Sequence, residues 1–196
     1  PRPKGNTATA LAEMERVFAA EGIEVETVQI GDKDVRGCIA CGTCGERGAC
    51  VFDDVVNEIA PKFEQADGLV VATPVYYASP NATVIALLDR LFYSAKFDKA
   101  MKVGASIAVA RRAGTTATLD VVNKYFSFAG MPVAPSKYWN VTHGAKPGEV
   151  VQDEEGMQIM RTLARNMAFL MKSIALGKEA YGLPEKEPGV MTNFVR

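Results

Sequence analysis

Apolar runs of strand length alternate along this chain with segments whose apolar residues recur every three to four positions. The run at 68–73 is continuously apolar, and that at 102–110 is largely so, which predicts strands buried on both faces of a parallel sheet. Shorter strands are expected at 25–30 and 131–135. Helical periodicity predicts helices at about 7–21, from 53 onward, 82–93, 115–129 and 153–176. This alternation predicts an α/β fold.

Two details of the pattern add expectations. Pro61 lies inside the helix that begins near residue 53, and should kink or split it. The chain opens on a loop that runs straight into a helix, whereas a doubly wound sheet places its first strand before such a loop. We therefore expect that strand to precede Pro1, since its neighbours would otherwise face an empty slot with unpaired backbone groups.

Composition limits the class of protein. The chain has 196 residues, 48% of them hydrophobic, which fits a single domain over 1–196. Lys and Arg total 22 against 23 Asp and Glu, and this balance argues against a nucleic-acid partner. No apolar run reaches the roughly 20 residues of a membrane helix, and no signal-peptide pattern opens the chain. Clustered thiols favour a reducing compartment, so we expect a cytoplasmic protein.

The opening stretch has the chemistry of an anion site. Gly5, Asn6 and Thr7 fall at a helix N-terminus, with Arg2 and Lys4 just before it. Free backbone N–H groups and the helix dipole attract a phosphate there. No G-x-G-x-x-G fingerprint and no P-loop occurs, so neither a dinucleotide site nor a P-loop is indicated. An ordinary capped helix explains the same residues.

Two more loops follow predicted strands at the carboxyl edge of the sheet, where open α/β sheets bind ligands. The stretch 72–83 carries Pro74, Tyr76 and Tyr77, a stiff aromatic loop suited to a flat polar ring. The stretch 110–116 carries Arg111 and Arg112. The tyrosines could instead close the core and the arginines could be solvated. Three such loops at one edge favour a ligand site.

All four cysteines lie within 37–52, spaced C-x2-C-x2-C-x5-C. A disulfide pair, a zinc site, a redox C-x-x-C pair and free thiols are alternatives. Three closely spaced cysteines with a fourth nearby favour a [4Fe–4S] cluster. Gly42, Gly45 and Gly48 should let the loop wrap tightly. The expected cluster ligands are Cys38, Cys41, Cys44 and Cys50.

The stretches "PRPKGNT", "DGLVVATPVYYASPNATVIALLDR" and "GMPVAPSKYWN" resemble the NAD(P)H-dependent FMN reductase family, and the cysteine stretch resembles its iron–sulfur flavoprotein branch. The resemblance runs from Pro1 to about Lys172. It implies a flavodoxin-like doubly wound sandwich with a five-stranded parallel sheet. It implies FMN, with its phosphate held by Arg2, Asn6 and Thr7, its ring lined by Pro74, Val75, Tyr76 and Tyr77, and its other edge closed by Arg112, Ala113 and Gly114.

The expected function is an FMN-dependent oxidoreductase that uses NAD(P)H. A nicotinamide gives its electrons as a hydride, a cluster passes them singly and a flavin does both, so the flavin belongs between them. The acceptor would be a small molecule or a protein. No side-chain acid or base is required, so no catalytic residue is named. The alternatives are a non-enzymatic flavodoxin-like electron carrier, which we expect to be more acidic, and a cofactor-poor binding scaffold.

The loop from 31 to 52 is far longer than a usual strand-to-helix connection. The resemblance favours a homodimer or homotetramer in which this loop approaches the flavin of a neighbouring subunit. Asp89 and Arg90 are interpreted as a charge contact at a helix end, and His143 as a loop or rim residue. Two groups fit either an interface or the core: Phe92, Tyr93 and Phe97, and Met157, Met160, Met167 and Met171.

Overall fold

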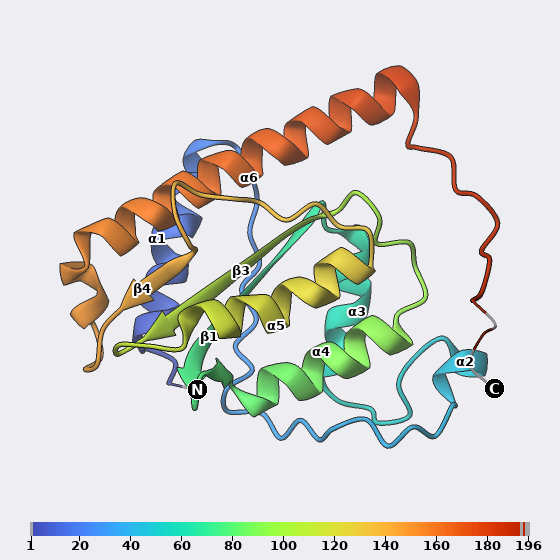
Figure 1. Cartoon of the computed structure of the whole chain (residues 1–196), viewed down its shortest axis with the longest axis horizontal. Coiled ribbons are helices and arrows are strands. Elements are labelled where there is room, and N and C mark those ends of the chain that lie inside the picture. Colours follow the sequence, from blue (N-terminus) through green and yellow to red (C-terminus); the bar gives the residue numbers. More distant parts are fainter. Residues whose placement is uncertain (1, 193, 195–196) are drawn as a thin grey trace.

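A computed structural model describes residues 2–192 and 194 of the chain. Its sheet has the strand order β2-β1-β3-β4 (Figure 1). The strands β1, β3 and β4 run parallel, and β2 pairs antiparallel with the end of β1. Their bounds are Gly68–Tyr76 for β1, Ser79–Pro80 for β2, Val103–Ala110 for β3 and Val141–His143 for β4.

Helices cover both faces of this sheet (Figure 1). One face packs against α1 (Asn6–Ala20) and the long α6 (Glu154–Tyr181). The other face packs against α3 (Val55–Gln65), α4 (Ala82–Ser94) and α5 (Thr115–Phe128). Two short elements complete the fold, α2 (Cys44–Arg47) and the 3₁₀ helix η1 (Glu149–Gln152). The prediction of a doubly wound α/β sandwich is confirmed.

The strand β3 forms the centre of the molecule. Every residue from Val103 to Ala110 is buried. Because successive side chains of a strand point to opposite faces, Val103 and Ile107 pack with α1 and α6, whereas Ala108 packs with Leu119 of α5. The expectation of a strand buried on both faces is correct here.

The strand β1 differs from that expectation, since most of its residues are only half buried. Within the part of the chain that the structure describes, β3 flanks one side of β1, and on the other side only β2 pairs with it, at Val75 and Tyr76. The stretch from Gly68 to Pro74 therefore has an open edge. The described residues form a sheet of four strands, which agrees with a five-stranded sheet whose first strand is not among them.

The strand predicted at 25–30 is wrong. The segment is extended but pairs with no strand of the described chain. A strand needs a neighbour for its backbone hydrogen bonds, and β1 does not reach this segment. Side chains hold it between two helices instead: Thr27 bonds to Glu15 of α1, and Glu26 pairs with Lys62 of α3.

Three smaller expectations also have outcomes. Helix α3 continues unbroken through Pro61, because Val56 and Phe63 on either side of it are buried in the core. The 131–135 strand is reduced to a single bridge between Val133 and Gly104. In the methionine group, Met160, Met167 and Met171 are core residues, whereas Met157 is half buried outside that cluster.

Candidate functional site

A strained hairpin turn closes the carboxyl end of β1. Tyr76 pairs with Ser79, which leaves Tyr77 and Ala78 as the two turn residues. Their φ angles are 50° and 57°, in the left-handed region that residues other than glycine rarely adopt. Such strain persists where surrounding structure enforces it and is concentrated at functional sites. Tyr76 and Tyr77 are both exposed, so they do not close the core.

The loop after β3 lies against this hairpin. Gly114 has a φ of 89°, and a Cβ added to it would lie 2.6 Å from the Cα of Ala78 and 3.0 Å from Cγ1 of Val75. Only glycine permits both this conformation and this approach. The structure thus brings Val75 and Gly114 together, as the site prediction requires. Arg112 and Ala113 lie exposed beside them.

The third loop is the N-terminus of α1. Its N-cap residue is Gly5, so no side chain caps the first turn. Asn6 is buried and its Oδ1 accepts a hydrogen bond from Val150 N–H at 3.4 Å. This contact ties the start of α1 to η1, beyond the carboxyl end of β4. The uncapped N–H groups fit an anion such as a phosphate.

The other residues predicted at this edge are in place but make few contacts. Arg2 is exposed, and its carbonyl accepts the N–H of Gly5 at 3.0 Å. Thr7 and Pro74 are half buried. His143, expected in a loop or at the rim, is the half-buried last residue of β4, and its backbone N–H donates to Oδ2 of Asp153 at 2.7 Å. The edge therefore offers positive charge, free N–H groups and exposed rings around one place.

The four cysteines line a pocket, which the C-terminal end of α4 closes with Arg90, Tyr93 and Ser94. Two of the thiols, Cys38 and Cys41, are exposed, whereas Cys44 and Cys50 are buried. All four are free thiols. The structure therefore places the four cysteines, which were predicted to form one site, around the same pocket.

In the described chain, no group of three or more His, Cys, Asp or Glu side chains is gathered closely enough to hold a single metal ion. A [4Fe–4S] cluster spreads its four thiolates further apart than one ion does, because each thiolate binds a different iron. Four thiols that share a pocket without converging on a point fit that donor set.

Local hydrogen bonds shape the loop around the thiols. The N–H of Ala40 donates to Sγ of Cys38 at 3.4 Å. Hydrogen bonds from Thr43 lower the pKa of the Cys41 thiol, which favours the thiolate that binds metal. Of the three glycines expected to bend the loop, Gly42 and Gly48 have positive φ, but Gly45 does not, because it belongs to α2.

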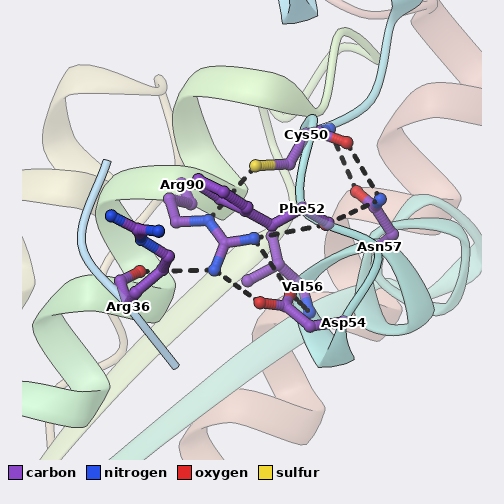
Figure 2. A network of polar contacts seen from close by, with 7 residues as sticks. All are labelled: Arg36, Cys50, Phe52, Asp54, Val56, Asn57 and Arg90. Atoms are coloured by element: carbon purple, nitrogen blue, oxygen red, sulfur yellow. Dashed lines mark hydrogen bonds and ion pairs between the residues drawn. The ribbon is translucent and has the colours of Figure 1, made fainter. Parts of the chain in front are cut away.

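A side chain from α3 fixes the backbone at Cys50. Asn57 accepts the N–H of Cys50 with Oδ1 at 3.0 Å. Its Nδ2 donates to the carbonyls of Cys50 at 3.0 Å and Phe52 at 3.1 Å (Figure 2). Sequence reasoning missed Asn57, and only its position at the start of the helix after the loop could have indicated it.

The interpretation of Asp89 and Arg90 as a charge contact is wrong. Neighbours on a helix point in different directions, and Asp89 instead accepts the hydroxyl of Tyr125. Arg90 points inward and pairs with Asp54, the N-cap of α3, at 2.7 Å (Figure 2). Burial raises the pKa of Asp54, but the hydrogen bonds from Arg90 and from Val56 N–H outweigh it and hold the pKa below its usual value.

Helix α4 connects the two sites (Figure 1). Its N-cap Asn81 follows the hairpin directly and donates its backbone N–H to Oγ1 of Thr73 at 3.0 Å. Its last turn, with Tyr93 and Ser94, lines the cysteine pocket. The helix has 13 residues, which makes it about 20 Å long. The two sites of one chain therefore lie at opposite ends of a rigid element.

Known proteins are similar to this chain over most of its length. The family model described as NADPH-dependent FMN reductase matches residues 1–146. An iron–sulfur flavoprotein of Methanocaldococcus jannaschii is 34% identical over 182 residues, which are 89% of this chain and 94% of the relative. An iron–sulfur flavoprotein of Methanosarcina thermophila is 31% identical over 185 residues, 91% of this chain and 95% of the relative.

The fold is similar to that of a known flavodoxin. A flavodoxin from the domain Archaea superposes with a TM-score of 0.59 and covers 88% of this chain and 94% of its own, at 14% identity. No helix among the described residues is both long and apolar enough to cross a membrane. The chain belongs to the NADPH-dependent FMN reductase family, in its iron–sulfur flavoprotein branch, and is a flavin-dependent oxidoreductase with a flavodoxin-like fold.

Proposed function

We propose that this protein is an FMN-containing oxidoreductase that takes electrons from NAD(P)H and relays them through a [4Fe–4S] cluster to a small-molecule or protein acceptor. The observation that carries the proposal is that one chain has both an anion-binding edge with strained aromatic walls and a pocket lined by four free thiols. A cluster bound by these thiols would let the protein pass electrons one at a time.

Different residues of the chain would bind the FMN phosphate, the flavin ring and the cluster. The first turn of α1, with Arg2, Asn6 and Thr7, would hold the FMN phosphate. The hairpin from Pro74 to Tyr77 and the loop from Arg112 to Gly114 would position the flavin ring. The cluster would be bound by Cys38, Cys41, Cys44 and Cys50. FMN, when bound, supplies hydride acceptance and single-electron release.

The deciding experiment is anaerobic purification followed by assays for iron, sulfide and flavin. We expect iron and sulfide in equal amounts, one flavin per chain and bleaching of the visible spectrum by NADH or NADPH. Bleaching only by a reduced protein partner would support the electron-carrier alternative. A protein that takes up neither flavin nor iron would be the binding scaffold and would contradict the proposal.

The proposal names FMN and not FAD. One uncapped helix N-terminus offers room for one phosphate, and no dinucleotide fingerprint follows a strand. Cofactor released by heat and separated by chromatography should therefore elute as FMN. Elution as FAD would mean that the α1 site has been assigned to the wrong ligand.

We also propose that the protein assembles as a homodimer or homotetramer in which the cysteine pocket of one chain meets the flavin of another. The two sites of one chain lie at opposite ends of α4, so a neighbouring copy offers a shorter route. Apolar side chains are exposed at both places. Ile39, Val51 and Tyr93 line the cysteine pocket, and Tyr76 and Tyr77 form the hairpin.

The proposed compartment is the cytoplasm. Four free thiols clustered in one loop persist where the surroundings are reducing, and they would pair as disulfides elsewhere.

A further inference from the structure

Arg90 is a buried cation in the wall of the cysteine pocket. Arg90 is only 1% exposed, although it belongs to the outer helix α4. Each of the five guanidinium N–H groups has a bonding partner (Figure 2). Burial of a charge is costly unless it is paired and hydrogen-bonded, so this arrangement has to be explained.

Four of the five bonds hold the guanidinium in one orientation. Nη1 donates to Oδ2 of Asp54 at 2.7 Å, and Nη2 donates to Oδ1 at 2.9 Å. The carbonyls of Arg36 and Phe52 accept the other two Nη hydrogens, at 3.3 and 3.4 Å. Because the guanidinium is planar, these bonds also fix the direction of Nε–H.

The remaining N–H group points at a cysteine. Nε of Arg90 donates to Sγ of Cys50 at 3.2 Å. Cys50 is itself buried, and Asn57 fixes its backbone on both sides. Arg90 is thus already paired with Asp54, and its one remaining N–H group donates to the fixed sulfur of Cys50. The effect is to stabilise negative charge on that sulfur.

We propose that Arg90 is a positioning residue for Cys50 that raises the reduction potential of the cluster. This inference rests on the proposed function, because it needs the cluster to be present. Reduction adds one negative charge, spread over the cluster and its sulfurs. A buried cation and an N–H···S hydrogen bond stabilise the reduced form more than the oxidised form, which shifts the potential upward.

A second arginine offers a matched control. The guanidinium of Arg36 stacks over the ring of Phe52, with its carbon 4.6 Å from the ring centroid, while Arg90 lies 5.1 Å from the same centroid. Arg36 is exposed, and its side chain has no hydrogen bond to any cysteine of the described chain. Replacing either arginine by Gln removes one positive charge beside the pocket, but only one replacement removes the bond to Cys50.

The experiment is a redox titration of the protein with its cluster bound, followed by electron paramagnetic resonance. Each cluster gains one electron from dithionite through dissolved mediators, and no covalent bond changes. In Arg90→Gln, the ratio of reduced to oxidised cluster at a fixed potential should fall about tenfold, a shift of about 59 mV to more negative values. In Arg36→Gln, the ratio should stay within about twofold of the wild type.

Asp54→Asn separates this role from a purely structural one. Both Arg90→Gln and Asp54→Asn break the buried pair and should lower thermal stability. The second variant removes a negative charge near the cluster, so its potential should move upward or stay unchanged. Loss of structure alone would move both variants in the same direction, and such a result would overturn the inference.

Two further outcomes are decisive. If Arg90→Gln loses the cluster, Arg90→Lys keeps the charge but not the Nε–H, and its potential should still fall, though by less. An unchanged potential in Arg90→Lys or in a loaded Arg90→Gln overturns the inference while the proposed function stands. A wild-type protein that takes up no iron overturns the proposed function, and this inference with it.

Discussion

Single side chains determine how the cysteine pocket is built. Two of its four thiols lie in the solvent-exposed part of the loop and the other two are buried, of which Cys50 is held by residues of α3 and α4. The exposed pair contributes only its sulfurs, whereas the buried pair is part of the packed structure. Substitutions in the two halves should therefore have different effects.

Cys41→Ala should remove most of the broad visible absorbance of the cluster and leave FMN bound. Cys41 is exposed, so its loss costs little packing, and the flavin loops lie at the other end of α4. Iron analysis and flavin fluorescence after precipitation check the two parts separately. Glu46→Gln, an exposed change in the same loop, is the control and should keep its iron. Full iron content in Cys41→Ala would contradict the ligand assignment.

Asp54→Asn should lower the free energy of unfolding by about 2 kcal/mol at pH 7. Asn caps a helix as well as Asp, so the change isolates the ion pair with Arg90. Because the folded-state pKa of Asp54 is lowered, its stabilisation is present above the unfolded pKa of about 3.9 and is lost as the pH falls through the folded value.

The difference between wild type and Asp54→Asn should therefore shrink as the pH falls below about 5, measured by urea unfolding followed by circular dichroism. Asp53→Asn makes the same charge change at an exposed neighbour and should stay within about 0.5 kcal/mol of the wild type. A difference that is constant with pH would show that the ion pair does not account for the lowered pKa.

At the scale of elements, loops and strand ends carry the sites, and the sheet and helices set their separation. The hairpin at Tyr77 and Ala78 and the loop at Gly114 touch because β1 and β3 are parallel neighbours in register. Helix α4 then carries the chain from that hairpin to the cysteine pocket.

Gly114→Ala should weaken FMN binding by tenfold or more. A methyl group there meets the Cα of Ala78 at 2.6 Å in a backbone conformation with φ of 89°, so the hairpin or the loop has to move. Fluorescence titration of the flavin-free protein with FMN measures the loss. Gly177→Ala is the matched control: it lies in α6 with open space around it, so FMN affinity should not change. Equal affinities in both variants would exclude the loop from the flavin site.

The elements with strong internal periodicity were predictable, and those that depend on a distant partner were not. The α4 and α5 boundaries agree with the sequence to within about two residues, because amphipathic spacing is a local property. The segment 25–30 has strand-like composition, but a strand is defined by its neighbour, and none pairs with it in the described chain.

In the candidate sites, too, local sequence features were predictable, whereas contacts between distant residues were not. Cysteine spacing and the polar start of α1 are visible in the sequence, so the two candidate sites could be anticipated. The Arg90–Asp54–Cys50 contacts join positions 36 and 40 residues apart through tertiary packing. Next to Asp89 in the sequence, Arg90 looked like part of a surface pair. Only its burial distinguishes it from an exposed arginine.

At the scale of the whole molecule, the placement of the sites makes assembly testable. A single chain exposes an apolar rim at the cysteine pocket and exposed tyrosines at the flavin edge. These surfaces lie at opposite ends of α4, so two copies related by a two-fold axis could cover both.

Light scattering should show a dimer or larger assembly for the wild type and a monomer for Ile39→Glu, with FMN still bound. Ile39 is 51% exposed beside the cysteines, and a carboxylate there would be buried unpaired in the interface. Leu176→Glu, a change at a 67% exposed leucine near the end of α6, is the control and should keep the wild-type mass. A monomeric wild type with both cofactors bound would refute the arrangement.

The unequal exposure of the four thiols also has a consequence for how the protein matures in the cell. Cys44 and Cys50 are set in place by the folded chain, while Cys38 and Cys41 stay open to an incoming iron donor. The polypeptide could thus fold first and acquire its cluster afterwards, at a site in which two of the four ligands are already held in place. When iron is scarce, such a chain would stay folded without its cluster and would bind the cluster once iron is available again. Newly made protein from iron-starved cells should therefore unfold cooperatively before any iron is added, and a molten, protease-sensitive chain would show that metal is needed earlier.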